Sequence, residues 1–374
     1  MLRRSSLHRL PWLVLVFALV LVLSGAPGAT GAAGAAGAAG AAGAAGAAGA
    51  AEVLRVLSWP GYADPDVVQA FEARTGARVE VTLVDSDETL WHKLTARDAT
   101  DYDVFAVNTA ELQRYIDRGL VVPIDAAALP NLAAQLPRFR DPATMPGTTR
   151  GGELYAVPYA WAEMGLIYDR RQFDAPPTSI AALWDARHRG KVLIYNSGSH
   201  NFSLAAQVLG KDSPFRLDTD DWAAAVARLV ELRRNLLTFY LHPEESAHLF
   251  VSRGAALMFA NYGTQQLHLL RAAGADVGYV IPREGALAWL DCWAVTRGAG
   301  NRRLALAWID HLLGTGPAHV LSARHGLANT RDPAPHQDET DRLVWLEPVE
   351  DVERRNLLWE RILSGDRAAR VLAP

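Results

Sequence analysis

The chain has 374 residues, of which 50% are hydrophobic and 21% charged, the balance of an ordinary globular protein. Its formal net charge of -4, without any basic cluster, excludes the electrostatic footprint of a nucleic-acid-binding protein. A single cysteine, Cys292, excludes an internal disulfide framework, and we interpret it as a small buried residue.

The chain begins with the features of an export signal. Three arginines (Arg3, Arg4 and Arg9) precede an apolar run over 10–23 that is too short for an ordinary membrane span. A Gly/Ala-rich stretch then continues to about residue 51 without large apolar side chains that could build a core. We therefore predict that residues 1–51 are a signal peptide plus a low-complexity spacer. An uncleaved anchor and twin-arginine export are the alternatives, and the cleavage position stays open.

The next part of the chain alternates between strand and helix patterns. Short apolar or alternating runs predict strands at 53–57, 79–84 and 102–107. Between and after them, amphipathic runs predict a helix capped by Asp64 and ended by Gly76, and further helices over 87–94 and 110–119. This alternation is typical of βαβ units with a largely parallel sheet.

The same alternation resumes in the second half of the chain. We expect strands at 190–195, 254–263, 277–282 and 287–295, and helices at 202–210, 220–236, 302–314 and 353–365. The length after residue 51 exceeds that of one typical domain, so we expect two α/β lobes. In such sheets ligands bind beyond the carboxyl ends of the strands, and clefts between domains are favoured sites.

Two loops that follow early strands carry candidate binding residues. Trp59 and Tyr62 flank the Pro60–Gly61 turn, where an indole ring could form a stacking wall, or could instead cover the sheet edge as a core residue. Asn108 and Thr109 follow a strand directly and could face a ligand, although a helix N-cap is the stronger interpretation of this pair.

Two loops in the second half carry further polar candidates. Ser197 and His200 lie in the stretch NSGSHN between a buried strand and a helix, a pattern typical of helix starts that bind anions. Asn261, Tyr262 and Thr264 follow another buried strand. Each of these residues could contact a ligand. For Ser197 and His200 the alternative is a helix cap or an exposed side chain, and for the loop after the other strand it is a simple turn.

The segment GALAWLD carries the most informative pair. Side chains two apart on a strand point to the same face, so the ring of Trp289 and the carboxylate of Asp291 share one face. An ionised aspartate is rarely buried without a partner. The partner is either an arginine of the protein or a cation from outside.

The sequence shows none of the catalytic motifs that we searched for. It contains no nucleophile elbow, no HExxH, no Cys/His cluster with metal spacing and no Gly-rich dinucleotide motif after the first strand. We therefore predict no catalytic residue, no cofactor and no metal, and leave open a catalytic pair assembled from distant residues.

The stretch after residue 53 resembles the polyamine branch of the bacterial extracellular solute-binding proteins, the spermidine/putrescine-binding receptors of ABC importers. The resemblance is carried, in order, by LSWPGYADPDVVQAFEARTGARVEV, DSDETLWHKL, YDVFAVNTAELQRYIDRGLVVPID, YAVPYAW and EGALAWLDCWAV. It implies a two-lobe periplasmic-binding-protein fold of type II-like architecture. Each lobe is a mixed, mostly parallel sheet flanked by helices, and the ligand cleft lies between the lobes. The implied boundaries are 52–157 with 290–333 for lobe 1, and 158–289 with 334–374 for lobe 2.

The resemblance also implies a function. Family aromatic rings sandwich a methylene chain while carboxylates hold its ammonium ends, and Trp59, Tyr62, Trp289 and Asp291 match such positions. The implied protein is a monomeric periplasmic receptor, not an enzyme, that captures a polyamine or another amine by hinge closure and delivers it to an ABC permease.

The chain departs from the family pattern where acids are expected. Asn196, Ser197 and His200 stand after one strand, and Asn261 and Thr264 after another. A dication with one counter-charge is poorly compensated. The alternatives are therefore a zwitterion, an aminophosphonate or an amino acid derivative as ligand, and a secreted enzyme on the same scaffold.

Overall fold

The computed structural model describes residues 51–333 and 342–373, so the predicted signal peptide and spacer lie outside the described residues apart from Ala51. The described residues form one compact unit. None of the helices in the described part of the chain is both long and apolar enough to cross a membrane. No group of histidine, cysteine or acidic side chains suited to a metal ion occurs among these residues.

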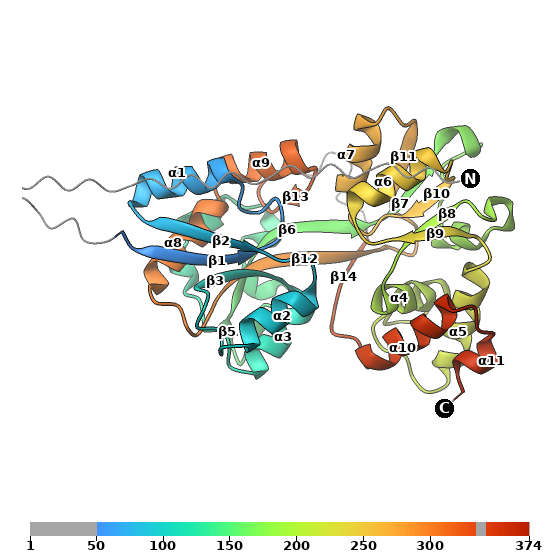
Figure 1. Ribbon diagram of the computed structural model, residues 1–374, viewed down its shortest axis with the longest axis horizontal. Coiled ribbons are helices and arrows are strands. Elements are labelled where there is room, and N and C mark those ends of the chain that lie inside the picture. Colours follow the sequence, from blue (N-terminus) through green and yellow to red (C-terminus); the bar gives the residue numbers. More distant parts are fainter. Residues whose placement is uncertain (1–50, 334–341, 374) are drawn as a thin grey trace, which may run out of the picture. The chain divides into compact units, whose positions relative to one another are not determined.

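The unit contains a larger and a smaller mixed sheet with helices on both faces, as expected for two α/β lobes (Figure 1). The larger sheet has the order β13-β6-β12-β3-β1-β2, with β14 paired to β12, and the smaller one the order β11-β7-β10-β8-β9. Strands of the larger sheet are β1 (Val53–Ser58), β2 (Arg78–Leu83), β3 (Val104–Asn108), β6 (Ala156–Met164), β12 (Ala286–Val295), β13 (Ala328–Asn329) and β14 (Leu343–Trp345). Strands of the smaller sheet are β7 (Leu166–Asp169), β8 (Val192–Tyr195), β9 (Leu236–Tyr240), β10 (Leu257–Phe259) and β11 (Val277–Val280).

Helices cover both faces of each sheet. Those on the larger sheet are α1 (Pro65–Thr75), α2 (Asp87–Thr95), α3 (Thr109–Asp117), α8 (Arg302–Leu312) and α9 (Thr315–His325). Those on the smaller sheet are α4 (Gly198–Val208), α5 (Asp221–Leu232), α6 (Pro243–Ser252), α7 (Thr264–Ala272), α10 (Val352–Leu363) and α11 (Ala368–Val371). Short 3-10 helices connect these elements, and a small hairpin pairs β4 (Thr149–Arg150) with β5 (Glu153–Leu154). Four clusters of buried apolar side chains fill the layers between helices and sheets.

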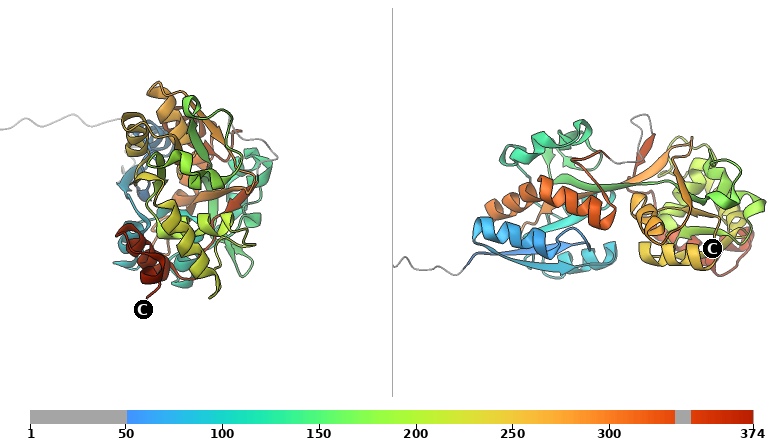
Figure 2. Two further views of the ribbon diagram at one scale, coloured as in Figure 1. Left: turned by 90° about the vertical axis from the view of Figure 1, so that its right-hand side faces the viewer. Right: turned by 90° about the horizontal axis from the view of Figure 1, so that it is seen from above.

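Strands β6 and β12 connect the two lobes. They pair antiparallel along most of their length and run side by side in the view from above in Figure 2. After β6, only Gly165 separates the chain from β7 of the smaller sheet, and β12 follows β11 of that sheet after a short turn. All nine residues of β6 are buried. The lobe boundaries predicted above stay a prediction.

The sheets are less parallel than the alternation of strands and helices suggests. Strands β1, β2 and β3 are parallel, as are β8, β9 and β10. In contrast, β12 runs antiparallel to both β3 and β6, and β7 runs antiparallel to β10 and β11. The connecting strands therefore add the antiparallel pairs, while the parallel strands keep their carboxyl ends at one edge of each sheet.

Two local predictions were wrong. The helix expected over 220–236 ends at Leu232, because the Asn235 side chain donates to the carbonyls of Leu183 (3.1 Å) and Asp185 (3.0 Å), and β9 starts at the next residue. Asp64 occupies the N-cap position of α1 but caps no backbone group. Its carboxylate instead pairs with Arg324 and His325 at the end of α9.

Candidate functional site

A patch of polar side chains lies where the parallel strands of the larger sheet end. Trp59 and Tyr62 follow β1, Asp87 follows β2 as the first residue of α2, and Asn108 ends β3. In the antiparallel pair of β12 and β3, Asp291 lies directly opposite Asn108. Because directly opposite residues in such a pair point to the same face, these loops and Asp291 form one site.

Asp291 accepts a hydrogen bond from a neutral donor, the Tyr62 hydroxyl, at 2.6 Å from Oδ2. No lysine or arginine within 51–333 and 342–373 forms an ion pair with this carboxylate. Burial raises the pKa of Asp291 to about 7, and the hydrogen bond from Tyr62 acts in the opposite direction. Burial, with the Asp291 charge beside it, also raises the pKa of Tyr62 well above its usual range, which keeps the phenol a donor.

The site holds a second carboxylate that the sequence prediction missed. The Asn108 amide nitrogen donates to Asp87 Oδ1 at 3.1 Å, while the Asn108 oxygen caps α3 by accepting from the Glu111 amide at 3.0 Å. Burial raises the pKa of Asp87 to about 8, and the charges of Glu111 and Asp291 add to this shift. Arg114 opposes the shift, but it donates to the main-chain oxygen of Asp87 at 3.2 Å and not to the carboxylate.

The sequence does contain a signal for Asp87, but it has two readings. An acid in the first turn of a helix is usually explained by the helix dipole, and Ser86 caps this helix by accepting from the Thr89 amide at 3.1 Å. The better signal is position: Asp87 follows β2, whose carboxyl end adjoins that of β1, and β1 pairs in turn with β3.

Trp289 lies between the two lobes. Its half-buried ring packs against apolar clusters of both lobes, and its indole nitrogen donates to the carbonyl of Asn261 at 2.9 Å. Trp289 and Asp291 thus share one face of β12, as predicted from their spacing. Trp59 is half-buried nearby in the loop after β1, and its indole nitrogen is enclosed without a hydrogen-bond partner in the described structure.

The remaining predicted residues follow strands of the smaller sheet or start helices. Ser197 caps α4 by accepting from the His200 amide at 3.3 Å, and Thr109 is buried as the first residue of α3. The Tyr262 hydroxyl donates to the carbonyl of Leu241 at 2.7 Å. The Thr264 hydroxyl donates to the carbonyl of Gly326 at 3.0 Å, so it contacts the larger lobe.

Tyr195 is another site residue that sequence reasoning missed. Its ring lies 5.6 Å from that of His200 and 5.8 Å from that of Tyr262. Burial raises the pKa of Tyr195, Tyr262 opposes this shift, and the charges of Asp87 and Glu88 add to it. The end of β8 therefore lies within electrostatic reach of the carboxylates on the larger lobe.

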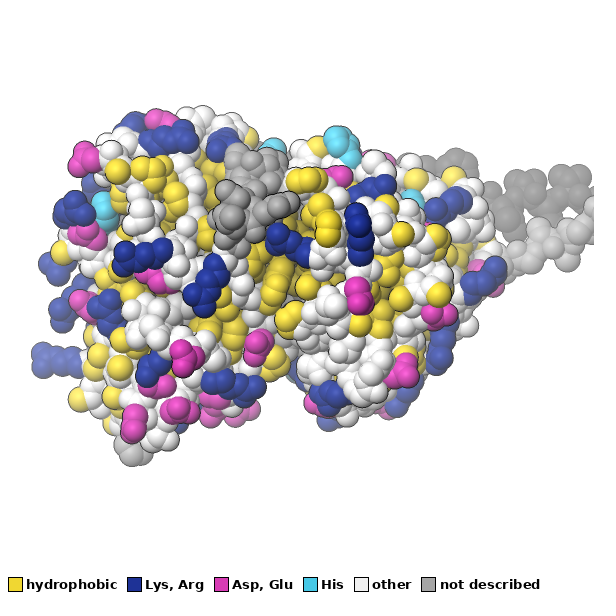
Figure 3. All heavy atoms as spheres, turned by 180° about the vertical axis from the view of Figure 1, so that it is seen from behind, with side chains coloured by type: hydrophobic (Ala, Val, Ile, Leu, Met, Phe, Trp, Pro, Cys, Tyr) yellow, Lys and Arg dark blue, Asp and Glu magenta, His cyan; other side chains and the backbone are white. Residues whose placement is uncertain are grey.

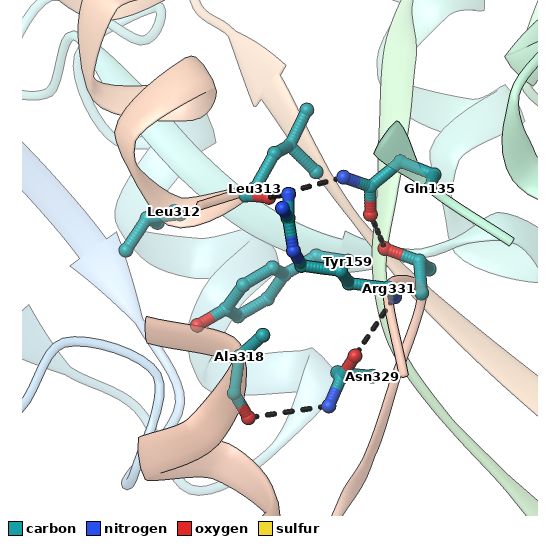
Figure 4. Close-up of a pocket in the computed structure, with 8 residues that line it drawn as sticks. Gln135, Tyr159, Leu312, Leu313, Ala318, Asn329 and Arg331 are labelled. Carbon is teal, nitrogen blue, oxygen red and sulfur yellow. Dashed lines mark hydrogen bonds between the residues drawn. The ribbon is translucent and has the colours of Figure 1, made fainter. Parts of the chain in front are cut away.

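Two hollows are lined by none of these residues. The first, drawn in Figure 4, is too narrow for a water molecule, and its polar groups bond to one another: Thr330 donates to Gln135 at 2.7 Å and Gln135 to the carbonyl of Leu313 at 3.0 Å. These hydrogen bonds hold the segment after β13 against the rest of the larger lobe. The second, of about 320 Å³, lies among α1, α8 and α9 and contains none of the predicted site residues.

The comparisons with known proteins agree with this architecture. The sequence profile of a family described as bacterial extracellular solute-binding protein matches residues 66–319. The spermidine/putrescine-binding periplasmic protein of Escherichia coli is 26% identical over 257 residues, which cover 68% of this chain and 71% of that protein. The putrescine-binding periplasmic protein PotF of the same organism is 28% identical over 286 residues, covering 70% and 73%.

Solved structures show the same fold. A putative spermidine/putrescine ABC transporter from Listeria monocytogenes superposes with a TM-score of 0.69 at 22% identity, over 84% of this chain and 99% of that one. The family profile spans more than half of the sequence, and the two-lobe architecture agrees with it. The chain therefore belongs to the family of bacterial extracellular solute-binding proteins.

Proposed function

We propose that this protein is the periplasmic receptor of an ABC importer and captures a polyamine or a related small amine. The observation that carries the proposal is the pair Asp291 and Asp87. Each carboxylate uses one oxygen for a neutral internal donor, Tyr62 or Asn108, and neither forms an ion pair with a described residue. An ammonium group would supply the missing charge and its N–H donors.

The surroundings fit an alkyl amine. Indole rings such as those of Trp59 and Trp289 attract a cation over their faces by about 0.5–2 kcal/mol and pack against methylene groups. Tyr62, Asn108 and Thr109 lie on the same lobe, while Ser197, His200, Asn261, Tyr262 and Thr264 belong to loops or helix starts of the other lobe. We propose these residues, with Asp291, as the ligand-binding set.

The relatives support the remaining parts of the proposal. They are named as periplasmic proteins that bind spermidine and putrescine, and one from Pseudomonas aeruginosa as a putrescine/agmatine-binding protein. We infer export by the N-terminal signal, action as a monomer without catalysis, and delivery to an inner-membrane permease. Hinge closure of the lobes 52–157 with 290–333 and 158–289 with 334–374 would trap the ligand. On the face in Figure 3, acidic and basic side chains are interspersed, which suits a small-molecule receptor better than a nucleic-acid partner.

A thermal-shift screen tests the ligand class, because a ligand that binds only the folded state raises the melting temperature by mass action. Putrescine, spermidine, 4-amino-1-butanol, amino acids, betaines and aminophosphonates should be compared at equal concentration. The proposal expects amines to raise the melting temperature and to be recovered unchanged. A shift confined to amino acids or aminophosphonates, or turnover of the bound compound, would contradict it.

Amine affinity should rise with pH between pH 6 and pH 8. The pKa values of Asp291 and Asp87 are raised to about 7 and about 8, so both groups are largely protonated at pH 6. An alkylammonium ion keeps its proton throughout this range, since its pKa resembles that of lysine at roughly 10.4. Because the cation favours ionised carboxylates, its binding releases protons.

Calorimetric titration should therefore show an affinity increase of about tenfold or more between pH 6 and pH 8, with net proton release. In the unliganded protein the same raised pKa values lower stability as pH rises from about 4 to 8, because the folded state holds more protons than the unfolded state. A pH-independent affinity would show that the two carboxylates do not meet the ligand.

A further inference from the structure

Two uncharged polar side chains of the smaller lobe, Asn261 and His200, lie where its strands β10 and β8 end. Asn261 is buried, with 5% of the residue exposed, and its Oδ1 atom is enclosed. The Nδ1 atom of His200 is also enclosed. The two side chains lie beside each other, and Asn261 acts on the His200 ring through a side-chain hydrogen bond. They form an uncharged polar pair where β8 and β10 end.

Contacts place these two residues next to the proposed amine site. The main-chain oxygen of Asn261 accepts from the Trp289 indole, and Trp289 shares its strand face with Asp291. The His200 ring lies against Tyr195, whose phenol is within reach of the Asp87 charge. Asn261 therefore contacts Trp289 through its main chain, and Asp291 lies two residues from Trp289 on the same strand face.

The histidine end carries no charge at neutral pH. Burial lowers the pKa of His200 to about 4, while the neighbouring Asn261 side chain acts in the opposite direction. The positive Arg355 adds to the lowering. The neutral imidazole and the amide can each donate or accept a hydrogen bond, but neither can neutralise an ammonium group.

Within the described part of the chain, the acidic side chains of the surrounding elements provide no buried carboxylate beside His200 and Asn261. Glu163 lies opposite Ala288 in the pairing of β6 and β12, so it belongs to the sheet face opposite that of Trp289 and Asp291. Glu245, after β9, accepts from the amides of Leu241 (2.8 Å) and His242 (3.4 Å) at the start of α6. Its neighbour Glu244 is exposed to solvent, where its charge acts on the Tyr262 phenol but is screened by water.

We propose that the ligand binds with one ammonium group between Asp87 and Asp291 and with a neutral hydrogen-bonding end against His200 and Asn261. This inference rests on the proposed amine-receptor function and narrows it. The preferred ligand class is a monoammonium compound with a polar, uncharged far end, such as an amino alcohol or an N-acylated diamine. A second ammonium group at the far end would lose water without gaining a counter-charge.

Calorimetric titration with three probes of similar length tests the inference: putrescine, 4-amino-1-butanol and N-acetylputrescine. We expect at least one of the two monoammonium probes to bind about tenfold or more tightly than putrescine, which corresponds to about 1.4 kcal/mol. The variant Asn261→Asp places a carboxylate of the same shape at the far end, and should shift the preference toward putrescine by about tenfold or more.

Two further variants complete the test. His200→Glu should shift the preference in the same direction, and a glutamate three residues after the Ser197 cap suits the start of α4. The control Asn301→Asp makes the same amide-to-acid exchange at the N-cap of α8, where aspartate caps equally well, and should leave the preference unchanged.

The outcomes separate the inference from the proposed function. If wild-type protein binds putrescine as tightly as or more tightly than both monoammonium probes, the neutral far end is wrong while the amine receptor stands. If Asn261→Asp and His200→Glu leave the preference unchanged, the assignment of these residues is wrong. If none of the three amines binds, the inference and the proposed function both fail.

Discussion

Replacing Asp291 by asparagine should weaken the binding of every amine ligand by about 100-fold or more. Removing one partner of a buried, hydrogen-bonded charge pair typically costs about 2–5 kcal/mol, and each 1.4 kcal/mol is about a tenfold change in affinity. Asparagine keeps the shape of the side chain and an oxygen that can accept from Tyr62, so the loop after β1 should keep its position. The loss is therefore one of charge at the ligand.

Titration calorimetry of wild type and variant measures this loss directly. The matched control is Asp117→Asn, which removes one negative charge from the exposed end of α3, where the carboxylate pairs with Arg150 at 2.5 Å. Surface ion pairs of this kind contribute about 0–1 kcal/mol, so amine affinity should hardly change. Equal affinity losses in both variants would show that Asp291 acts on the ligand only by long-range attraction and does not contact it.

Replacing Arg355 by methionine should lower the free energy of unfolding by about 3–5 kcal/mol. Arg355 belongs to α10, and its fully buried side chain donates to Glu350 (2.7 Å), to the Ser203 hydroxyl (2.8 Å) and to the carbonyl of Ser199 (3.0 Å). Methionine fills a similar volume but leaves the Glu350 charge and these oxygens without donors.

Urea denaturation of the two proteins measures the difference, and Arg354→Met on the same helix provides the control. Arg354 is exposed and its guanidinium lies 4.2 Å from the centre of the Trp222 ring, a contact that contributes about 0.5–1 kcal/mol. Similar losses in both variants would mean that the buried network adds no more to stability than a surface contact does.

Much of the fold follows from local patterns. The alternation of residues on β12 predicted that Trp289 and Asp291 share a face, and polar loops after apolar strands predicted where the candidate residues lie. Asn108 was predicted as a helix cap or a ligand contact. Its oxygen caps α3 as predicted, its nitrogen donates to Asp87, and the ligand contact stays a prediction.

The roles of some residues could not be predicted from local patterns, because these roles depend on partners that are distant in the sequence. Asp87 looks like any acid in a first helical turn until β3 brings Asn108 beside it, a separation of 21 residues. Asp64 looks like a helix cap until α9 brings Arg324, which lies 260 residues away in the sequence. Arg355 lies on a polar helical stretch, and its burial becomes visible only when α10 packs on α4. Long-range contacts of this kind leave no periodicity in the sequence.

The most direct test of the account is a crystal structure of the protein with 4-amino-1-butanol or putrescine bound. We expect the ammonium nitrogen within about 2.7–2.9 Å of carboxylate oxygens of both Asp291 and Asp87, with the methylene chain against the Trp289 ring. An ammonium nitrogen elsewhere would contradict the account. An ion pair between Asp291 and an arginine or lysine of the chain in the liganded protein would also contradict it.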